Sequence, residues 1–95
     1  MERVENLMSF DVPVNAADGT AYRARARARE RDDDGLWEAW IEFSAVTGAE
    51  PLVVATPRET TQPNLEAARY WATGLSHVFL EGALARARDT VVSHA

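Results

Sequence analysis

The chain contains no cysteine and no lysine, and all of its apolar runs are short. Without cysteine there is neither a disulfide framework nor thiolate chemistry. The apolar runs stay well below the roughly 20 residues that a membrane helix needs, and the N-terminal residues lack the apolar core of a signal peptide. These absences favour a soluble, cytoplasmic protein that has no membrane partner.

Every basic side chain is an arginine, and alanine is very common. This composition is typical of a GC-rich bacterial genome, so the arginines alone do not indicate nucleic-acid recognition. The net charge of −5 also argues against a dedicated nucleic-acid binder. A length of 95 residues predicts a single domain, 1–95, with one modest core.

The most regular feature is an alternation of arginine with alanine. Arginine occupies positions 23, 25, 27, 29 and 31; Tyr22 precedes the first of them, and the positions between them hold Ala24, Ala26, Ala28 and Glu30. Successive side chains of a strand point to opposite faces. The segment therefore predicts a strand over residues 20–31 with one charged face and one face of mainly small residues.

A turn sequence, Asp34-Gly35, separates this strand from a second one over residues 36–46. A two-residue loop and a four-residue loop over 32–35 are both compatible with the sequence. In both registers the arginines face Glu38, Trp40 and Glu42, while the alanines share a face with apolar residues of the second strand. The agreement of two independent alternations supports the pairing.

The rest of the chain predicts two outer strands and a helix. Alternating apolar residues from Met8 to Val14 indicate a first strand, and Pro13 places it at a sheet edge. Residues 52–56 form a further strand that ends at Pro57, after a turn over 47–51. We expect residues 1–6 to be frayed, 7–62 to form the sheet, and 63–88 to form a helix capped by Thr61 or Gln62. The predicted class is α+β: a mainly antiparallel, three- to four-stranded sheet with one long C-terminal helix on one face.

Two stripes run along the predicted helix. The stripe expected to face the core comprises Leu65, Ala68, Ala72, Leu75, Phe79 and Gly82. Trp71, Leu75 and Phe79 are expected to fill the shallow alanine face. Gly74 either kinks the helix or permits close packing. The opposite stripe comprises Tyr70, Thr73, His77, Leu80 and Leu84, and we interpret Tyr70, His77, Leu80 and Leu84 as a homodimer interface.

The charged face of the hairpin is the candidate partner-binding surface. Its residues are Arg25, Arg27, Arg29, Glu38, Trp40 and Glu42. A solvated, ion-paired sheet face would explain the charges, but an outward Trp beside arginines has the composition of an interface hot spot. RNA binding is the alternative, against which the two glutamates argue.

Other polar motifs have simpler explanations. The acidic run before Gly35 lacks the remaining ligands of a calcium loop, and residues 58–62 have the composition of a helix cap rather than of an anion site. His77 and His94 have no second metal ligand at a suitable spacing. No nucleophile is paired with a base, and there is no glycine-rich phosphate loop. We therefore expect no enzyme activity, cofactor, metal or small-molecule substrate.

The order of strand, DG turn, strand and helix resembles the HicB-type antitoxin domain over about residues 22–88. The matching features are Tyr22, the segments 33–35 and 36–40, and Glu59-Thr-Thr before the helical segment 65–68. The resemblance implies a partly degraded RNase-H-like core that binds and blocks a small RNA-cleaving toxin. The chain departs from the family in lacking its proline–glycine segment after the second strand and its C-terminal DNA-binding segment. The predicted function is a non-catalytic protein-interaction module that binds a protein partner or itself, with an antitoxin-like inhibitor as one version.

Overall fold

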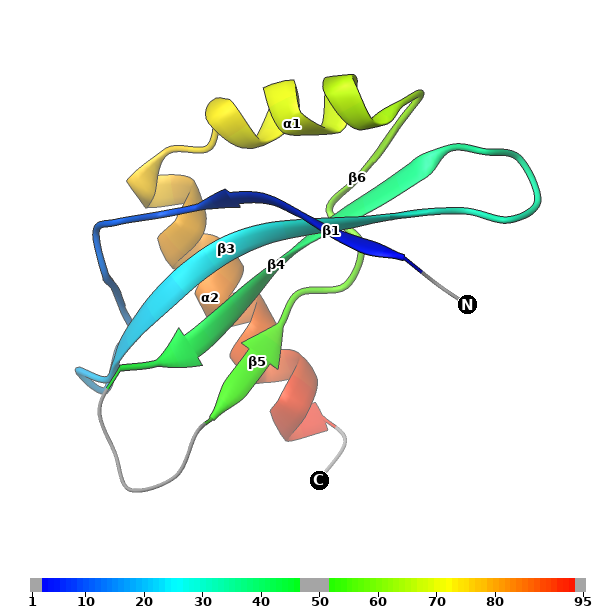
Figure 1. Cartoon of the computed structure of the whole chain (residues 1–95). Helices are drawn as coiled ribbons and strands as arrows, with labels where there is room; N and C mark the ends of the chain where they lie inside the picture. The colour runs from blue at the N-terminus through cyan, green and yellow to red at the C-terminus, as the bar shows by residue number, and fades with distance from the viewer. Residues whose placement is uncertain (1–2, 47–51, 94–95) are drawn as a thin grey trace.

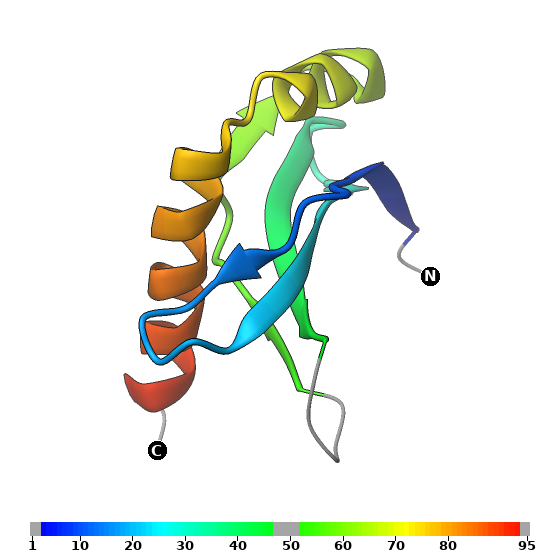
Figure 2. The ribbon, with the colours of Figure 1, turned by 90° about the vertical axis from the view of Figure 1, so that its left-hand side faces the viewer.

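The structure is a computed structural model that describes residues 3–46 and 52–93. Within these residues, two helices form one layer and a six-stranded sheet forms the other (Figure 1). The view in Figure 2 shows both helices on the same side of the sheet. All strand pairings are antiparallel. The expected α+β class with an antiparallel sheet is therefore confirmed.

The strands are β1 (Val4–Ser9), β2 (Val14–Asn15), β3 (Ala21–Glu30), β4 (Trp37–Ala45), β5 (Val53–Ala55) and β6 (Thr60–Gln62). The main strands follow the order β1-β3-β4-β5. The two short strands add no further row, because β2 pairs with β3, as β1 does, and β6 pairs with β4, as β5 does. The edge position expected for the first strand is confirmed. The two short strands β2 and β6 were not predicted.

The β3–β4 hairpin uses the four-residue loop. The backbone N–H of Arg31 donates to the carbonyl of Leu36 at 2.7 Å, and Arg29 pairs with Glu38. Gly35 adopts a φ of 72°, a conformation that costs a residue with a Cβ atom about 1–2 kcal/mol. The register places the arginines and the alanines on opposite faces, as the alternation predicts.

The alanine face of the hairpin lies under the helices. One half of this face is packed against α1 (Leu65–Thr73). We call it the narrow half, because small side chains on the sheet and on the helix let the two backbones approach closely. The buried alanines of this half are Ala26, Ala28 and Ala39 of the sheet and Ala68 and Ala72 of α1.

The wider half of the core lies under α2 (His77–Ser93). It contains Val14, Tyr22, Ala24, Ile41, Phe43 and Val54 of the sheet and Leu80, Ala83, Leu84 and Ala87 of α2. Trp71 and Leu75 pack against both halves, as expected for side chains that fill the space above the alanines. Phe79, the third residue expected there, is instead exposed and lies beside Arg86.

The prediction of one long C-terminal helix on one face is confirmed only in part, because this region forms two helices on that face, separated at residues 74–76. Gly74 ends α1, and the Ser76 hydroxyl accepts the backbone N–H of Phe79 at 3.1 Å in the first turn of α2. The expected caps are also corrected, because Thr61 and Gln62 pair with β4 as part of β6. The side chain of Asn64 caps α1 instead, accepting the N–H of Ala67 at 2.8 Å.

The break also changes which residues face the core. It shifts the phase of α2 relative to α1, so Leu80 and Leu84 are only 2% and 1% exposed. The predicted exposed stripe is therefore wrong for these two residues, which cannot contribute to a surface interface. Tyr70 is 81% exposed, and His77 is exposed as well.

The strand boundaries at the N-terminal edge also differ from those expected. Residues 4–6 belong to β1 rather than to a frayed end, and the strand stops before Phe10. A register shift between Asn6 and Met8 interrupts its pairing with β3. Arg69 of α1 donates from Nη1 to the backbone carbonyl of Asn6 at 3.2 Å. The predicted turn over 47–51 and His94 lie outside the described residues.

Candidate functional site

The face of the sheet opposite the helices carries the charged side of the hairpin. We define the outer face by residues 23, 25, 27 and 29 of β3 and residues 38, 40 and 42 of β4. The side chains of Arg27, Glu38 and Glu42 are each only 19% exposed although neither helix covers them. The structure therefore brings together all six residues predicted for partner binding, and they pack against one another.

Glu42 connects one end of this face to its centre. Its Oε1 accepts Arg25 Nε at 3.1 Å and Arg27 Nη1 at 3.3 Å. Its Oε2 accepts the indole N–H of Trp40 at 3.2 Å. The Arg25–Glu42 cross-strand pair expected from the four-residue loop is thus formed, and the carboxylate is shared by two guanidinium groups and one indole.

Glu38 occupies the equivalent position at the other end. Its Oε1 accepts Arg29 Nε at 3.2 Å, and its Oε2 lies 3.9 Å from both Arg31 Nη1 and Arg58 Nη1. Arg31 also contacts Asp33 and Asp34 of the hairpin loop, at 3.5 and 3.3 Å. The hydrogen bond from Arg31 lowers the pKa of Asp33. The acidic residues of the hairpin loop thus pair with the last arginine of the alternating segment.

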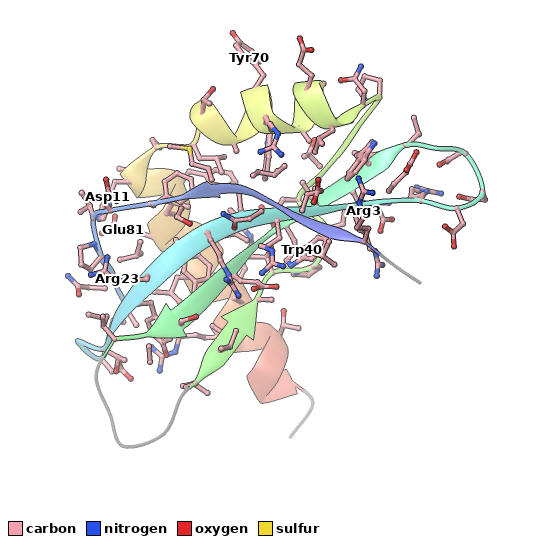
Figure 3. All side chains as sticks on the ribbon, viewed as in Figure 1. Arg3, Asp11, Arg23, Trp40, Tyr70 and Glu81 are labelled. Atoms are coloured by element: carbon pink, nitrogen blue, oxygen red, sulfur yellow. The ribbon has the colours of Figure 1, made fainter. Side chains whose placement is uncertain are left out.

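Trp40 lies between the two glutamates and is partly exposed. The guanidinium carbon of Arg29 lies 5.9 Å from the centre of the indole ring, within the range of a cation–π contact. Figure 3 shows Trp40 over the middle of the sheet, whereas Tyr70 projects from α1 away from the sheet. The ring is therefore fixed at its N–H edge by Glu42 and on one face by Arg29.

Arg27 pairs with Trp40 across the hairpin at the centre of the outer face. Among the described residues, its Nε is a buried side-chain nitrogen for which no hydrogen-bond partner is present. Leaving a buried donor unsatisfied costs about 1–3 kcal/mol.

A pocket of about 250 Å³ adjoins Trp40. It is lined by Arg29, Glu38, Trp40, Thr56, Pro57 and Arg58. The hydroxyl of Thr56 accepts the backbone N–H of Ile41 at 3.1 Å, which holds the start of the β5–β6 connection against β4. Thr56, Pro57 and Arg58 were not predicted as part of this surface, because their proximity to Trp40 depends on how the connection folds back.

A larger pocket, of about 530 Å³, lies elsewhere, between the β2–β3 turn and α2. Its charged lining is Asp18, Glu81, Arg88 and Asp89, and Arg88 Nη2 donates to Asp18 Oδ2 at 2.7 Å. This hydrogen bond is the main reason why the pKa of Asp18 lies far below its usual range, and a hydrogen bond from the backbone N–H of Thr20 lowers it further. The pocket is thus crossed by an ion pair that joins the turn to the helix.

Asp18→Asn is expected to destabilise the protein at neutral pH but not at strongly acidic pH. Because the pKa of Asp18 is lowered on folding, the ion pair stabilises the fold above the unfolded pKa of about 3.9 and loses this effect as the pH falls. The amide retains an acceptor for the Thr20 N–H, so the variant removes mainly the charge. Solvent screening keeps the effect small.

Urea unfolding of wild type and Asp18→Asn between pH 7 and pH 2 measures this difference. The difference between the two unfolding midpoints should be constant from pH 7 down to about pH 4 and then narrow progressively as the pH falls to 2. Asp11→Asn, which removes an exposed charge from the β1–β2 connection, is the control and should follow the wild-type profile. A constant difference at every pH would contradict the role of the Asp18–Arg88 pair.

The described residues contain no group of three or more His, Cys, Asp or Glu side chains placed to hold a metal ion. His77 lies 3.8 Å from Glu81 on the exposed side of α2. Glu59, in the segment considered as an anion site, binds Arg86 at 2.6 Å, and α1 begins only after Asn64. The helix start that the anion hypothesis required is therefore not at residues 58–62.

No helix among the described residues combines the length and apolar character needed to span a membrane. Comparison of the chain with protein-family models, curated proteins and solved structures finds no match in any of the three.

Proposed function

We propose that this protein is a non-catalytic interaction module that docks a protein partner on its outer face. The observation that carries the proposal is the placement of Trp40, which is held by Glu42 and Arg29 in a partly exposed position on a helix-free face. Trp and Arg are enriched among the residues that dominate binding energies. A side chain that is already fixed loses less conformational entropy when a partner binds.

The ion pairs that surround Trp40 support the same proposal. An apolar contact from a partner over Trp40 would remove further water from the ion pairs beside it and strengthen them.

The charge of this face indicates the chemistry of the partner. Four arginines of β3 share the outer face with two glutamates of β4, although the chain as a whole carries a net charge of −5. Two copies of such a face would repel each other. We therefore infer a different protein that presents an acidic surface, rather than self-association through this face.

The same charge bears on the two other candidate functions. Arg29 occupies one face of the Trp40 ring, so an RNA base could stack only on the other face, and Glu38 and Glu42 repel phosphates. An antitoxin-like role predicts a small, basic toxin as the partner. The arginine excess complements an acidic partner better than a basic one.

Affinity capture with paired baits tests the proposal. Wild type, Trp40→Ala and Tyr70→Ala are used as baits in lysate of the source organism, and captured proteins are quantified by mass spectrometry. We expect a partner whose capture falls at least tenfold with Trp40→Ala, as is usual for a hot-spot aromatic, and is unchanged with Tyr70→Ala. The affinity of the purified partner is then measured by calorimetry with the same three proteins.

Several outcomes would reject protein docking on the outer face. One is that no captured protein depends on Trp40, and another is that Tyr70→Ala causes the same loss. Capture that depends on Trp40 but disappears after ribonuclease treatment would favour RNA binding instead. Thermal unfolding of Trp40→Ala, followed by circular dichroism, checks that lost capture does not result from lost structure.

A further inference from the structure

The outer face of β4 has a regular chemical pattern along the strand. Glu38, Trp40 and Glu42 alternate with the buried side chains of Ala39 and Ile41. Neighbouring outward positions on a strand are about 6.6 Å apart, so the two glutamates are separated by about 13 Å. An extended peptide laid along β4 has the same spacing between its alternate side chains.

Each glutamate is surrounded by more than one guanidinium group. Glu42 accepts hydrogen bonds from Arg25 and Arg27, and Glu38 pairs with Arg29 and lies 3.9 Å from Arg58. Arg31 is paired with the aspartates of the hairpin loop and is left out of this comparison. Each glutamate still lies beside two arginines, so one positive charge exceeds the negative charge at each end. The outer face thus has an excess of positive charge at each end and an aromatic ring between the two ends.

The pocket beside Trp40 provides an apolar contact next to the centre, on the Glu38 side of the ring. Trp40 and Pro57 supply its apolar walls, and Arg29, Glu38 and Arg58 its charged groups. Its volume of about 250 Å³ lies below the roughly 300–1,000 Å³ of small-molecule sites. This size suits a single apolar side chain of a protein partner better than a cofactor or a substrate.

From these three observations, and resting on the proposed docking function, we propose that the outer face recognises an extended acidic segment of its partner. The segment has the side-chain pattern acidic–x–apolar–x–acidic. The apolar side chain enters the pocket beside Trp40. One carboxylate binds near Arg29 and Arg58, and the other binds near Arg25 and Arg27.

Nuclear magnetic resonance titration of the whole ¹⁵N-labelled protein with short peptides tests this pattern. The probe is N-acetyl-Glu-Ser-Leu-Ser-Glu-amide, which reads the same in both directions and therefore does not depend on peptide orientation. Controls replace one or both Glu with Gln, or permute the same residues to Glu-Glu-Leu-Ser-Ser. The indole N–H signal of Trp40, assigned with Trp40→Phe, reports binding at the centre of the face.

The probe is expected to shift the Trp40 indole signal saturably at low salt. Each Glu to Gln replacement should weaken binding about fivefold, the effect of one favourable surface ion pair, and two replacements about 25-fold. Equal affinity for the permuted peptide, or shifts confined to helix residues, would overturn the proposed pattern. Tighter binding of a uridine pentanucleotide than of the probe would also overturn it, in favour of RNA.

Two charge variants place the carboxylate sites. Arg58 is 56% exposed in the β5–β6 connection, so Arg58→Gln should leave folding intact and weaken the probe about fivefold. Arg69→Gln removes the same charge from α1 and should not change the affinity for the probe. Equal effects of the two variants would show that only net charge matters and would overturn the assignment.

The outcomes separate this inference from the function on which it rests. If the partner still requires Trp40 but the probe and the permuted peptide bind equally, the acidic pattern is wrong and docking on the outer face stands. If capture of a protein partner does not depend on Trp40, both are rejected.

Discussion

Leu84→Ala is expected to lower the free energy of unfolding by about 2–5 kcal/mol, as is usual for a leucine removed from a core. Leu84 is 1% exposed and packs in the wider half of the core with Tyr22 and Phe43. The loss is a large share of the roughly 5–15 kcal/mol that stabilises a typical domain. Urea unfolding measures it through the shift of the midpoint.

Tyr70→Ala is the matched control, because Tyr70 was predicted for the same stripe but is 81% exposed on α1. Its effect on the free energy of unfolding should stay within about 0.5 kcal/mol. Sedimentation of both variants separates a core role from an interface role. If Leu84→Ala left the unfolding midpoint unchanged and dissociated a dimer, the placement of Leu84 in the core would be wrong.

Ala26→Leu is expected to destabilise the protein by about 1–3 kcal/mol, because a larger side chain overpacks the space between sheet and helices. Ala26 has no exposed surface and pairs with Ile41 in β4. For a domain of this size, such a loss corresponds to a fall in Tm of about 4–20 °C. Calorimetry or circular dichroism measures the change.

Arg25→Leu provides a control one residue away on the same strand. Its side chain points to the outer face and is 46% exposed, so losing the pair with Glu42 should cost at most about 1 kcal/mol. The large difference expected between neighbouring positions is a direct test of the two-faced strand. Similar falls in Tm for both variants would contradict it.

The hairpin could be predicted because two local patterns agree. The arginine–alanine alternation of β3 and the alternation of Glu38, Trp40 and Glu42 each specify a face, and only registers that match them satisfy both. The choice between the two loops could not be made, because Asp34-Gly35 is compatible with either. In the structure, the Arg31–Leu36 hydrogen bond closes the four-residue loop.

The helical region was predicted less well, because the break shifts the phase of every later residue. Gly74 was predicted to kink the helix or to permit close packing, and Ser76 was not considered, because an uninterrupted stripe through Phe79 matched the helical period. Tertiary packing decides between them, since two helices follow the twisted sheet and bury Leu80 and Leu84. The pocket at Trp40 was missed for a similar reason, as Pro57 and Arg58 come from a distant loop.

The interrupted outer strands affect how this sheet behaves at high concentration. An unpaired edge can add a strand from another chain, the first step of aggregation. Here β1 has an irregular register and a backbone carbonyl occupied by Arg69, and β5 ends two residues before Pro57. Neither edge offers a long, regular template, so the sheet can present a broad, rigid surface without readily growing into fibrils.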